Sequence, residues 1–260
     1  MRQIFTARWD AVPLCELYIL MNKLTFYLIF FTVLVAGFLF FALRGYDFSR
    51  SKLAVINSEI PEFSFVNQNN KPITKKQVEG KVYVAEYFFT TCKGICPKMN
   101  ANMRRVYDTY KNEEQFLIVS HTCMPETDSI PLLKAYEKQM IQGKLLRKDD
   151  GSYTFGELMP QTPDTNKNWH FVTGEKEQLY FLARKGYMID NGKPDTTQHI
   201  DDQFIHTQFF ALVDKMGRVR GIYDGLISDE VDKMMLDIRE LLNEKVTSTR
   251  FVGGFNNNPS

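Results

Sequence analysis

The segment TTCKGICPKM, residues 90–99, places Cys92 and Cys96 four residues apart, with Pro97 directly after the second thiol. Two such thiols can form a structural disulfide, act as a dithiol redox couple, or supply two arms of a metal site. Thiolates are soft ligands that suit copper(I) or zinc. Two sulfur atoms leave a metal site incomplete, so a metal would require a further ligand from elsewhere in the chain.

The residues behind Pro97 predict that a helix begins at the cysteine pair. Proline is well placed in a first helical turn, and apolar residues then recur at helical spacing, namely Met99, Met103, Val106, Tyr107 and Tyr110. We therefore expect the two thiols to project on the same side, about one turn apart. A helix N-terminus favours the thiolate, and Lys93 adds positive charge, so both thiols are expected to be more acidic than an ordinary cysteine.

Histidine is the usual partner of two thiolates, and the chain has four candidates: His121, His170, His199 and His206. His206 opens the strand pattern IHTQFFALVD, so its side chain can reach the end of the sheet where the cysteine loop is expected. His199 lies in a charged loop and is expected to face solvent, whereas His170 follows Trp169 in a short strand and is expected to be packed. For any one histidine taken alone, a hydrogen-bonded structural role is the commoner one.

A third thiol, Cys123, stands beside Met124 in the stretch SHTCMPETD. One interpretation is that Cys123 is a small, partly buried apolar residue. The alternative is that Cys123 or Met124 lies near the cysteine loop and offers an auxiliary soft ligand or a resolving thiol. The nearby and later acidic residues are expected to be solvated loop charges: Glu126, Asp128, Asp201 and Asp202.

The elements that must position these side chains alternate between strand and helix patterns. Strands are predicted at 82–89, 116–120 and 168–174, and helices after Pro97 and at 129–140 and 175–186. A hairpin is predicted around Gly217, a last helix capped by Ser228, and an exposed insertion at 141–168. This order predicts an α/β fold with a mixed central sheet covered by helices on both faces. The cysteine loop then follows a central strand at its carboxyl end, where such sheets place functional loops.

An apolar run of 20 residues, Leu24 to Leu43, contains no charge between Lys23 and Arg44. At about 1.5 Å per residue, a helix of this length spans roughly 30 Å of hydrocarbon. We expect an uncleaved membrane anchor, because the run is long for a signal peptide and no clear A-x-A site follows it. The flanking charges are balanced and do not indicate an orientation. Met21 resembles a natural start for such an anchor, so either Met1 or Met21 begins the native chain.

The expected organisation is a short N-terminal segment (1–23), the anchor (24–43), a linker (44–57), an α/β domain (58–246) and a flexible tail (247–260). The 260 residues are 44% hydrophobic and carry a formal net charge of +1, which suits one globular domain plus appendages. Basic and acidic residues nearly balance and no long Lys/Arg run occurs, which argues against nucleic-acid binding. Four cysteines are too few for a disulfide framework.

Four segments of this sequence resemble the Sco/SenC family of thioredoxin-like copper proteins: YFFTTCKGICPKM, SHTCMPETDSIPLLKAYEK, NWHFVTG and FIHTQFFALVDKMGRVRGIYDG. They extend over nearly the whole soluble domain. The resemblance implies a thioredoxin-like fold for 58–246 and places the family's copper ligands on Cys92, Cys96 and His206. The family commonly has Asp-Pro in the second loop and an acidic residue inside the cysteine motif, where this chain has Met124-Pro125 and Lys93.

The resemblance also implies a function. The chain would bind copper(I) or copper(II) and serve the binuclear copper site of cytochrome c oxidase, with the copper-bearing oxidase subunit as its partner. Other copper chaperones or thiol reductants would be further partners. The domain would face the extracytoplasmic side, which is the periplasm in a Gram-negative source. This describes a metallochaperone rather than an enzyme.

The competing interpretation is a thiol-disulfide oxidoreductase or redox sensor, in which Cys92 and Cys96 cycle between dithiol and disulfide without obligatory copper. His206 discriminates between the two functions, because metal binding needs this ligand and simple thiol exchange does not. A peroxidase is a third option on the same scaffold, but the second cysteine together with His206 argues against it.

Overall fold

The computed structural model describes residues 14–43, 51–159, 166–190 and 207–245. The chain divides into two compact units, residues 1–48 and 49–260. The first unit contains helix α1 (Leu14–Leu43), in which residues 23–42 are long and apolar enough to cross a bilayer. The side chains of these residues are exposed, as expected for a segment that meets lipid rather than a protein core.

The second unit is built on a seven-stranded sheet with the strand order β2-β1-β7-β4-β3-β8-β9. The strands are β1 (Ser64–Asn67), β2 (Pro72–Thr74), β3 (Val82–Phe88), β4 (Phe116–Thr122), β7 (Trp169–Thr173), β8 (Phe209–Val213) and β9 (Val219–Asp224). β3, β4 and β7 run parallel, and the remaining pairs are antiparallel. Every residue of β3 and β4 is buried, because helices cover both faces of these central strands.

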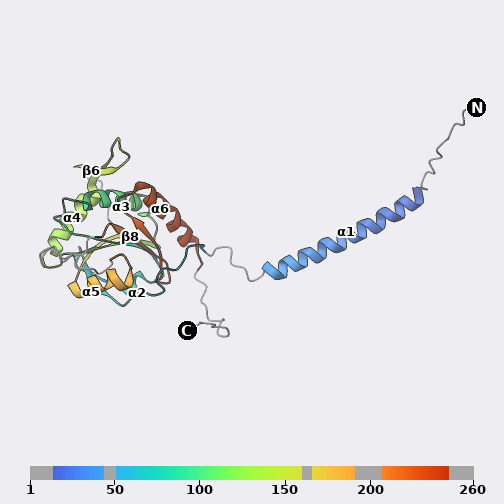
Figure 1. Cartoon of the computed structure of the whole chain (residues 1–260), viewed down its shortest axis with the longest axis horizontal. Coiled ribbons are helices and arrows are strands. Elements are labelled where there is room, and N and C mark those ends of the chain that lie inside the picture. The colour runs from blue at the N-terminus through green and yellow to red at the C-terminus, as the bar shows by residue number, and fades with distance from the viewer. Residues whose placement is uncertain (1–13, 44–50, 160–165, 191–206, 246–260) are drawn as a thin grey trace, which may run out of the picture. The chain divides into compact units, whose positions relative to one another are not determined.

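The helices form one layer on each side of the sheet (Figure 1). α3 (Cys96–Tyr110), α4 (Ile130–Gln142) and α6 (Ser228–Asn243) cover one face. α2 (Lys75–Val78) and α5 (Lys176–Phe181), which continues into the π-helical turn η1 (Leu182–Gly186), cover the other. The core accordingly has two parts, which we call the α3-side cluster and the α5-side cluster. The predicted α/β fold with a mixed sheet and helices on both faces is confirmed.

Alternation along β3 divides its side chains between these clusters. Val84 and Phe88 belong to the α3-side cluster, whereas Tyr83, Ala85 and Tyr87 belong to the α5-side cluster. Because successive residues of a strand point to opposite faces, Glu86 is directed to the α3 side. The single acidic residue of this strand therefore lies on the same face as helix α3.

The antiparallel pairing of β8 with β3 brings a distant part of the chain to the cysteine loop. Tyr83 pairs with Val213 and Ala85 with Ala211, so β8 begins beside the carboxyl end of β3. The cysteine loop follows β3 directly. Thr207, the first described residue before β8, therefore enters the sheet at the edge that carries the cysteines.

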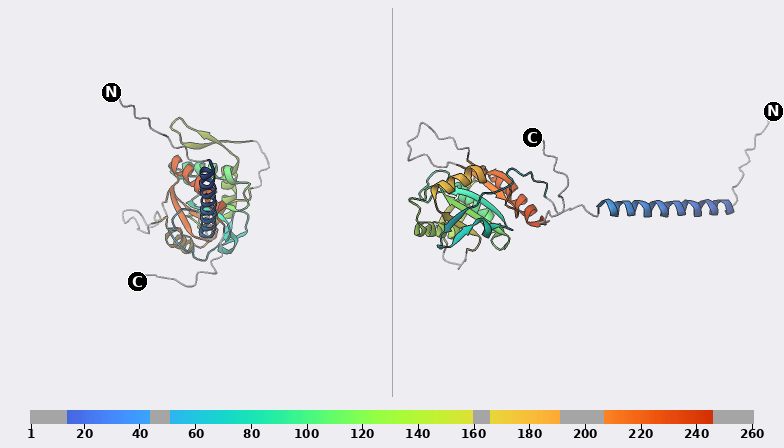
Figure 2. Two further views of the ribbon diagram at one scale, coloured as in Figure 1. Left: turned by 90° about the vertical axis from the view of Figure 1, so that its right-hand side faces the viewer. Right: turned by 90° about the horizontal axis from the view of Figure 1, so that it is seen from below.

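Residues 141–168, expected to be an exposed insertion, contain a second sheet. β5 (Gly143–Arg147) and β6 (Tyr153–Leu158) form an antiparallel hairpin that stands out from the main sheet (Figures 1 and 2). Phe155 packs against the α3-side cluster, and the guanidinium of Arg105 lies 4.3 Å from the ring centre of Tyr153. These contacts attach the hairpin to helix α3.

Two further details differ from the sequence expectations. α6 begins at Ser228, and Ile227 occupies the capping position without a side-chain hydrogen bond, so the prediction that Ser228 caps the helix was wrong. The second half of the predicted linker lies against the domain: Ile56 N donates to Val219 O at 2.8 Å, and Leu53 O accepts from the Arg220 guanidinium at 2.7 Å. Residues 51–57 are therefore part of the second unit.

Candidate metal and thiol site

The cysteine loop joins the end of β3 to the start of α3. Cys92 N donates to Phe89 O at 3.2 Å, which closes a turn just after the strand. Met99 N donates to Ile95 O at 3.0 Å, so the helical hydrogen bonding begins at Ile95 and Cys96 is the first residue of α3. Only Cys96 belongs to the helix, and Cys92 lies in the loop before it. The expectation that both cysteines form the helix start holds for one of them.

The two thiols lie close enough to influence each other's ionisation, and their surroundings differ. No disulfide joins them. Cys96 is 5% exposed and part of the α3-side cluster, whereas Cys92 is half-buried at its edge. Burial raises the pKa of the Cys96 thiol well above its ordinary value, and the neighbouring Cys92 thiol raises it further. The prediction that both thiols are unusually acidic was therefore wrong for Cys96, because desolvation outweighs the helix N-terminus.

Asp128 fixes the cysteine loop to the neighbouring strand. The backbone N–H and the hydroxyl of Thr90 donate to its carboxylate at 3.2 and 2.5 Å, and the hydroxyl of Thr122 at the end of β4 donates as well. Asp128 is only 1% exposed, so the prediction that it is a solvated loop charge was wrong. Three donors replace the water that this carboxylate loses on burial.

Glu86 is a buried carboxyl on the face of the sheet beneath α3. Ser120 Oγ donates to its Oε1 at 2.5 Å, and Trp169 Nε1 donates to Ser120 Oγ at 2.7 Å. Its Oε2 has no hydrogen-bond partner among the described residues. Desolvation raises the pKa of Glu86 to about 8, against the opposing effect of the Ser120 hydrogen bond. The Glu86 side chain therefore holds a proton at neutral pH. In the sequence, Glu86 stands out only as the single acidic residue of an apolar strand.

The backbone of Cys123 is hydrogen-bonded to the end of β3, next to the cysteine loop. Its side chain packs on the α5 side of the sheet. Its N–H donates to Phe88 O at 2.8 Å, at the end of β3, and its C=O accepts from Tyr180 Oη at 3.1 Å. The side chain is 2% exposed and belongs to the α5-side cluster, against which Met124 also packs. An auxiliary role of Cys123 or Met124 stays a prediction.

The four histidines divide evenly between described and undescribed parts of the chain. His121 is fully buried, stacks on Tyr87 with ring centres 4.9 Å apart, and has a pKa lowered to about 4 by burial. His170 is half-buried beside Asn67, and burial lowers its pKa to about 4 as well. His199 and His206 lie outside the described residues.

The described residues thus supply part of the predicted ligand set. Within them, no group of three His, Cys, Asp or Glu side chains is placed to hold a metal ion. Cys92 and Cys96 are brought together as predicted, and the third predicted ligand, His206, lies outside the described ranges. Asp201 and Asp202 lie outside them too.

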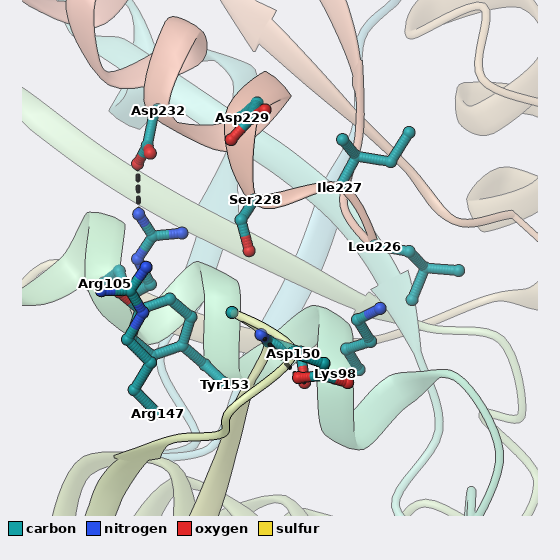
Figure 3. Close-up of a pocket in the computed structure, with 12 residues that line it drawn as sticks. Lys98, Arg105, Arg147, Asp150, Tyr153, Leu226, Ile227, Ser228, Asp229 and Asp232 are labelled. Carbon is teal, nitrogen blue, oxygen red and sulfur yellow. Dashed lines mark hydrogen bonds and ion pairs between the residues drawn. The ribbon is translucent and has the colours of Figure 1, made fainter.

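Two hollows flank the hairpin near the start of α3. One, of about 350 Å³, lies between the cysteine loop, α4 and β6, and we call it the Cys92 groove after the thiol that lines it. The other, of about 390 Å³, lies between the hairpin, α3 and the start of α6 (Figure 3). In this second hollow Arg105 pairs with Asp232. The other charged residues of the wall are Lys98, Arg147, Asp150 and Asp229, so its three basic and three acidic groups balance.

Comparison with known proteins bears on the identity of this site. Residues 54–145 match the family described as SCO1/SenC. The SCO1 protein homolog of Bacillus subtilis (strain 168) is 28% identical over 186 residues, which is 71% of this chain and 83% of that protein.

Two solved structures are similar over most of the chain. A SCO1/SenC family lipoprotein from Bacillus anthracis str. Ames is 28% identical, with a TM-score of 0.55, over 72% of this chain and 97% of that one. The structure of BsSco, described as having a disulfide switch and as a member of the Sco family of cytochrome c oxidase assembly proteins, is 26% identical, with a TM-score of 0.56, over 75% of this chain and 100% of that one. The motifs, the sheet and these matches agree: the second unit is similar to SCO1/SenC proteins in sequence and has their thioredoxin-like fold.

Proposed function

We propose that this protein binds copper through Cys92, Cys96 and His206 and delivers it to, or prepares the cysteines of, the binuclear copper site of cytochrome c oxidase. One observation carries the proposal: a chain similar to Sco proteins holds two neighbouring thiols, without a disulfide, after the carboxyl end of its central strand. Its relative BsSco is described as belonging to a family of cytochrome c oxidase assembly proteins.

The residues fit copper as a cargo. Two soft sulfur donors and one imidazole suit copper(I) in trigonal geometry, and copper(II) with an added ligand. His206 directly precedes Thr207, and Thr207 enters the sheet beside the cysteine loop. Both thiols must lose their protons when the metal binds, so copper affinity is expected to rise with pH.

The location follows from the anchor. We infer that α1 holds the protein in a membrane as a single-pass anchor and that the domain faces the extracytoplasmic side. Support comes from the 20-residue apolar span 23–42 and from the B. anthracis relative, which is described as a lipoprotein. The client is then the copper-bearing oxidase subunit, and this makes the protein a metallochaperone.

The His206→Ala variant tests the copper proposal. We expect the purified full-length variant to lose tight copper(I) binding, measured by competition with a chromogenic chelator, because two sulfurs alone leave the metal under-coordinated. His199→Ala is the matched control, since it removes a nearby histidine that is predicted to face solvent. Wild-type copper affinity in His206→Ala would contradict the three-ligand site.

A second function, thiol-disulfide exchange, is favoured by the proximity of the two thiols and by the disulfide switch described for BsSco. It requires Cys92 and Cys96 but not His206. The His206→Ala protein is therefore expected to form and reduce the Cys92–Cys96 disulfide as the wild type does, measured by thiol titration in glutathione buffers. Loss of disulfide formation in this variant would show that the histidine serves both functions.

A further inference from the structure

The Cys92 groove is the one described hollow that a cysteine of the pair lines. Cys92 forms part of its wall, and the buried Cys96 does not. Its volume of about 350 Å³ is in the range of small-ligand sites. A groove of this size is far too small to hold a folded domain. A few residues of extended chain can enter it. Such a segment would lie against Cys92.

The side chains that form the walls of the groove are fixed by contacts with the core of the domain. The ring of Tyr136 stacks on Phe88 with centres 4.9 Å apart, and its hydroxyl accepts a hydrogen bond from Asn100 Nδ2 at 2.9 Å. Phe155 of the hairpin faces the groove and packs against the α3-side cluster. The groove is therefore preformed, which lowers the entropy lost when a segment binds.

The rim combines hydrogen-bonding side chains with one charge. Gln139 of α4 and Thr154 of β6 both line the groove, and their side chains can form hydrogen bonds with a peptide backbone. Among the described residues that line the groove, Lys93 alone is charged. Its side chain is exposed, and no ion pair is formed by it within the described ranges. A segment that carries an acidic residue next to its cysteine would complement this rim.

We propose that the Cys92 groove docks an extended segment of the client protein that carries a cysteine flanked by acidic residues, with an acidic side chain facing Lys93. This inference rests on the proposed function, in which the client presents cysteines. It adds the surface that receives them, between the cysteine loop, α4 and the hairpin, and the sequence chemistry that this surface selects. The β5–β6 hairpin would then contribute to recognition of the client segment, in addition to packing against α3.

The test uses the full-length, reduced, copper-free protein in detergent micelles. The probe is a ten-residue peptide with one cysteine flanked by Asp and Glu, activated as a disulfide with 5-thio-2-nitrobenzoate. The Cys92 thiolate attacks the peptide sulfur, forms the Cys92–peptide disulfide, and releases the yellow thionitrobenzoate anion. A second peptide has Lys in place of the acidic residues. We expect the acidic peptide to react about tenfold faster at low salt, with a smaller difference at high salt.

Two variants and one control test whether the peptide preference arises in the groove. Lys93→Glu should reverse the preference between the peptides, whereas Lys185→Glu, a charge reversal on the other face of the sheet, should leave it unchanged. Thr154→Trp fills the groove and should slow both peptides, while its reaction with the small reagent methyl methanethiosulfonate stays at the wild-type rate. Equal rates for the two peptides in the wild type, or unchanged selectivity in Lys93→Glu, would overturn the docking site.

Copper binding by Thr154→Trp separates this inference from the proposed function. The variant is expected to retain wild-type copper affinity, because Thr154 is not among the proposed ligands. A wild-type protein that binds no copper but still prefers the acidic peptide would refute the copper proposal alone. A protein that binds copper but shows no peptide preference would refute the docking site alone.

Discussion

Cys92 and Cys96 are chemically unequal, because Cys92 borders a groove and Cys96 is buried at the start of helix α3. We predict that iodoacetamide at pH 7 modifies Cys92 much faster than Cys96 or Cys123, since burial restricts access to both of those thiols and raises their pKa values. Peptide mapping by mass spectrometry measures the three rates. In 6 M guanidinium chloride the rates should converge, and equal rates in the folded protein would contradict the asymmetry.

Asp128 is a second residue whose role is set by burial. We predict that Asp128→Ala lowers the free energy of unfolding by about 1 to 3 kcal/mol, because the donors of Thr90 and Thr122 lose their acceptor. Urea unfolding followed by circular dichroism measures the change. Asp149→Ala, at the exposed tip of the hairpin, is the matched control and should change stability little. Equal effects of the two substitutions would show that the buried contacts of Asp128 contribute nothing.

For single residues, the sequence predicted the features that depend on neighbours close along the chain and missed those that depend on distant residues. The cysteine pair was recognisable because its members are four residues apart and precede a helix pattern. The burial of Asp128 was not, because it depends on Thr90, which lies 38 residues away in the chain and meets the carboxylate only after folding. The pKa of Cys96 was missed for a related reason, since the helix start is visible in the sequence and the packing over the thiol is not.

At the scale of elements, strand β3 carries a proton that links stability to pH. The pKa of Glu86 in the folded protein is about 8, against an ordinary value of 4.5, so above pH 4.5 the folded state holds a proton that the unfolded state has released. The contribution of Glu86 to stability is therefore constant below about pH 4.5 and falls as pH rises to about 8. At 1.36 kcal/mol per pKa unit, the full decrease is roughly 5 kcal/mol.

We predict that Glu86→Gln, which stays neutral, loses less stability than the wild type between pH 5 and pH 8.5. Urea unfolding at a series of pH values measures the two slopes. The lowered pKa values of His121 and His170 destabilise both proteins equally as pH falls below 6.5, so the difference between the curves isolates Glu86. Glu114→Gln, on the exposed surface, should follow the wild-type curve. Parallel curves for wild type and Glu86→Gln would contradict a buried proton.

The elements themselves were predictable where periodicity is strong. β3, β4 and β7 read as buried strands because apolar residues fill both of their faces, and α3 and α6 show a clear helical repeat. The hairpin of β5 and β6 was missed because its strands are half-exposed and border a run of charges at 147–150. Its position depends on Phe155 and Tyr153 packing onto α3, which no local pattern reveals.

At the scale of the whole molecule, the span 23–42 is long and apolar enough to cross a membrane, and the proposed location of the domain depends on it. We predict that the full-length protein stays in the membrane pellet after alkaline carbonate extraction. The double variant Phe31→Arg, Leu34→Arg should be released, because each arginine near the middle of a span costs about 3 kcal/mol on insertion. Phe181→Arg, an exposed position on the domain, is the matched control and should remain in the pellet.

Orientation is tested on the same protein by labelling intact cells with a membrane-impermeant maleimide. Cys92 is half-buried beside an open groove, so an extracytoplasmic domain should be labelled before lysis, and a Cys92→Ser variant should lose that label. Labelling that occurs only after lysis would place the domain in the cytoplasm and refute the proposed location. Because copper(I) and disulfide exchange both depend on the redox state around the thiols, this result also determines which of the two proposed functions the cysteine pair can perform.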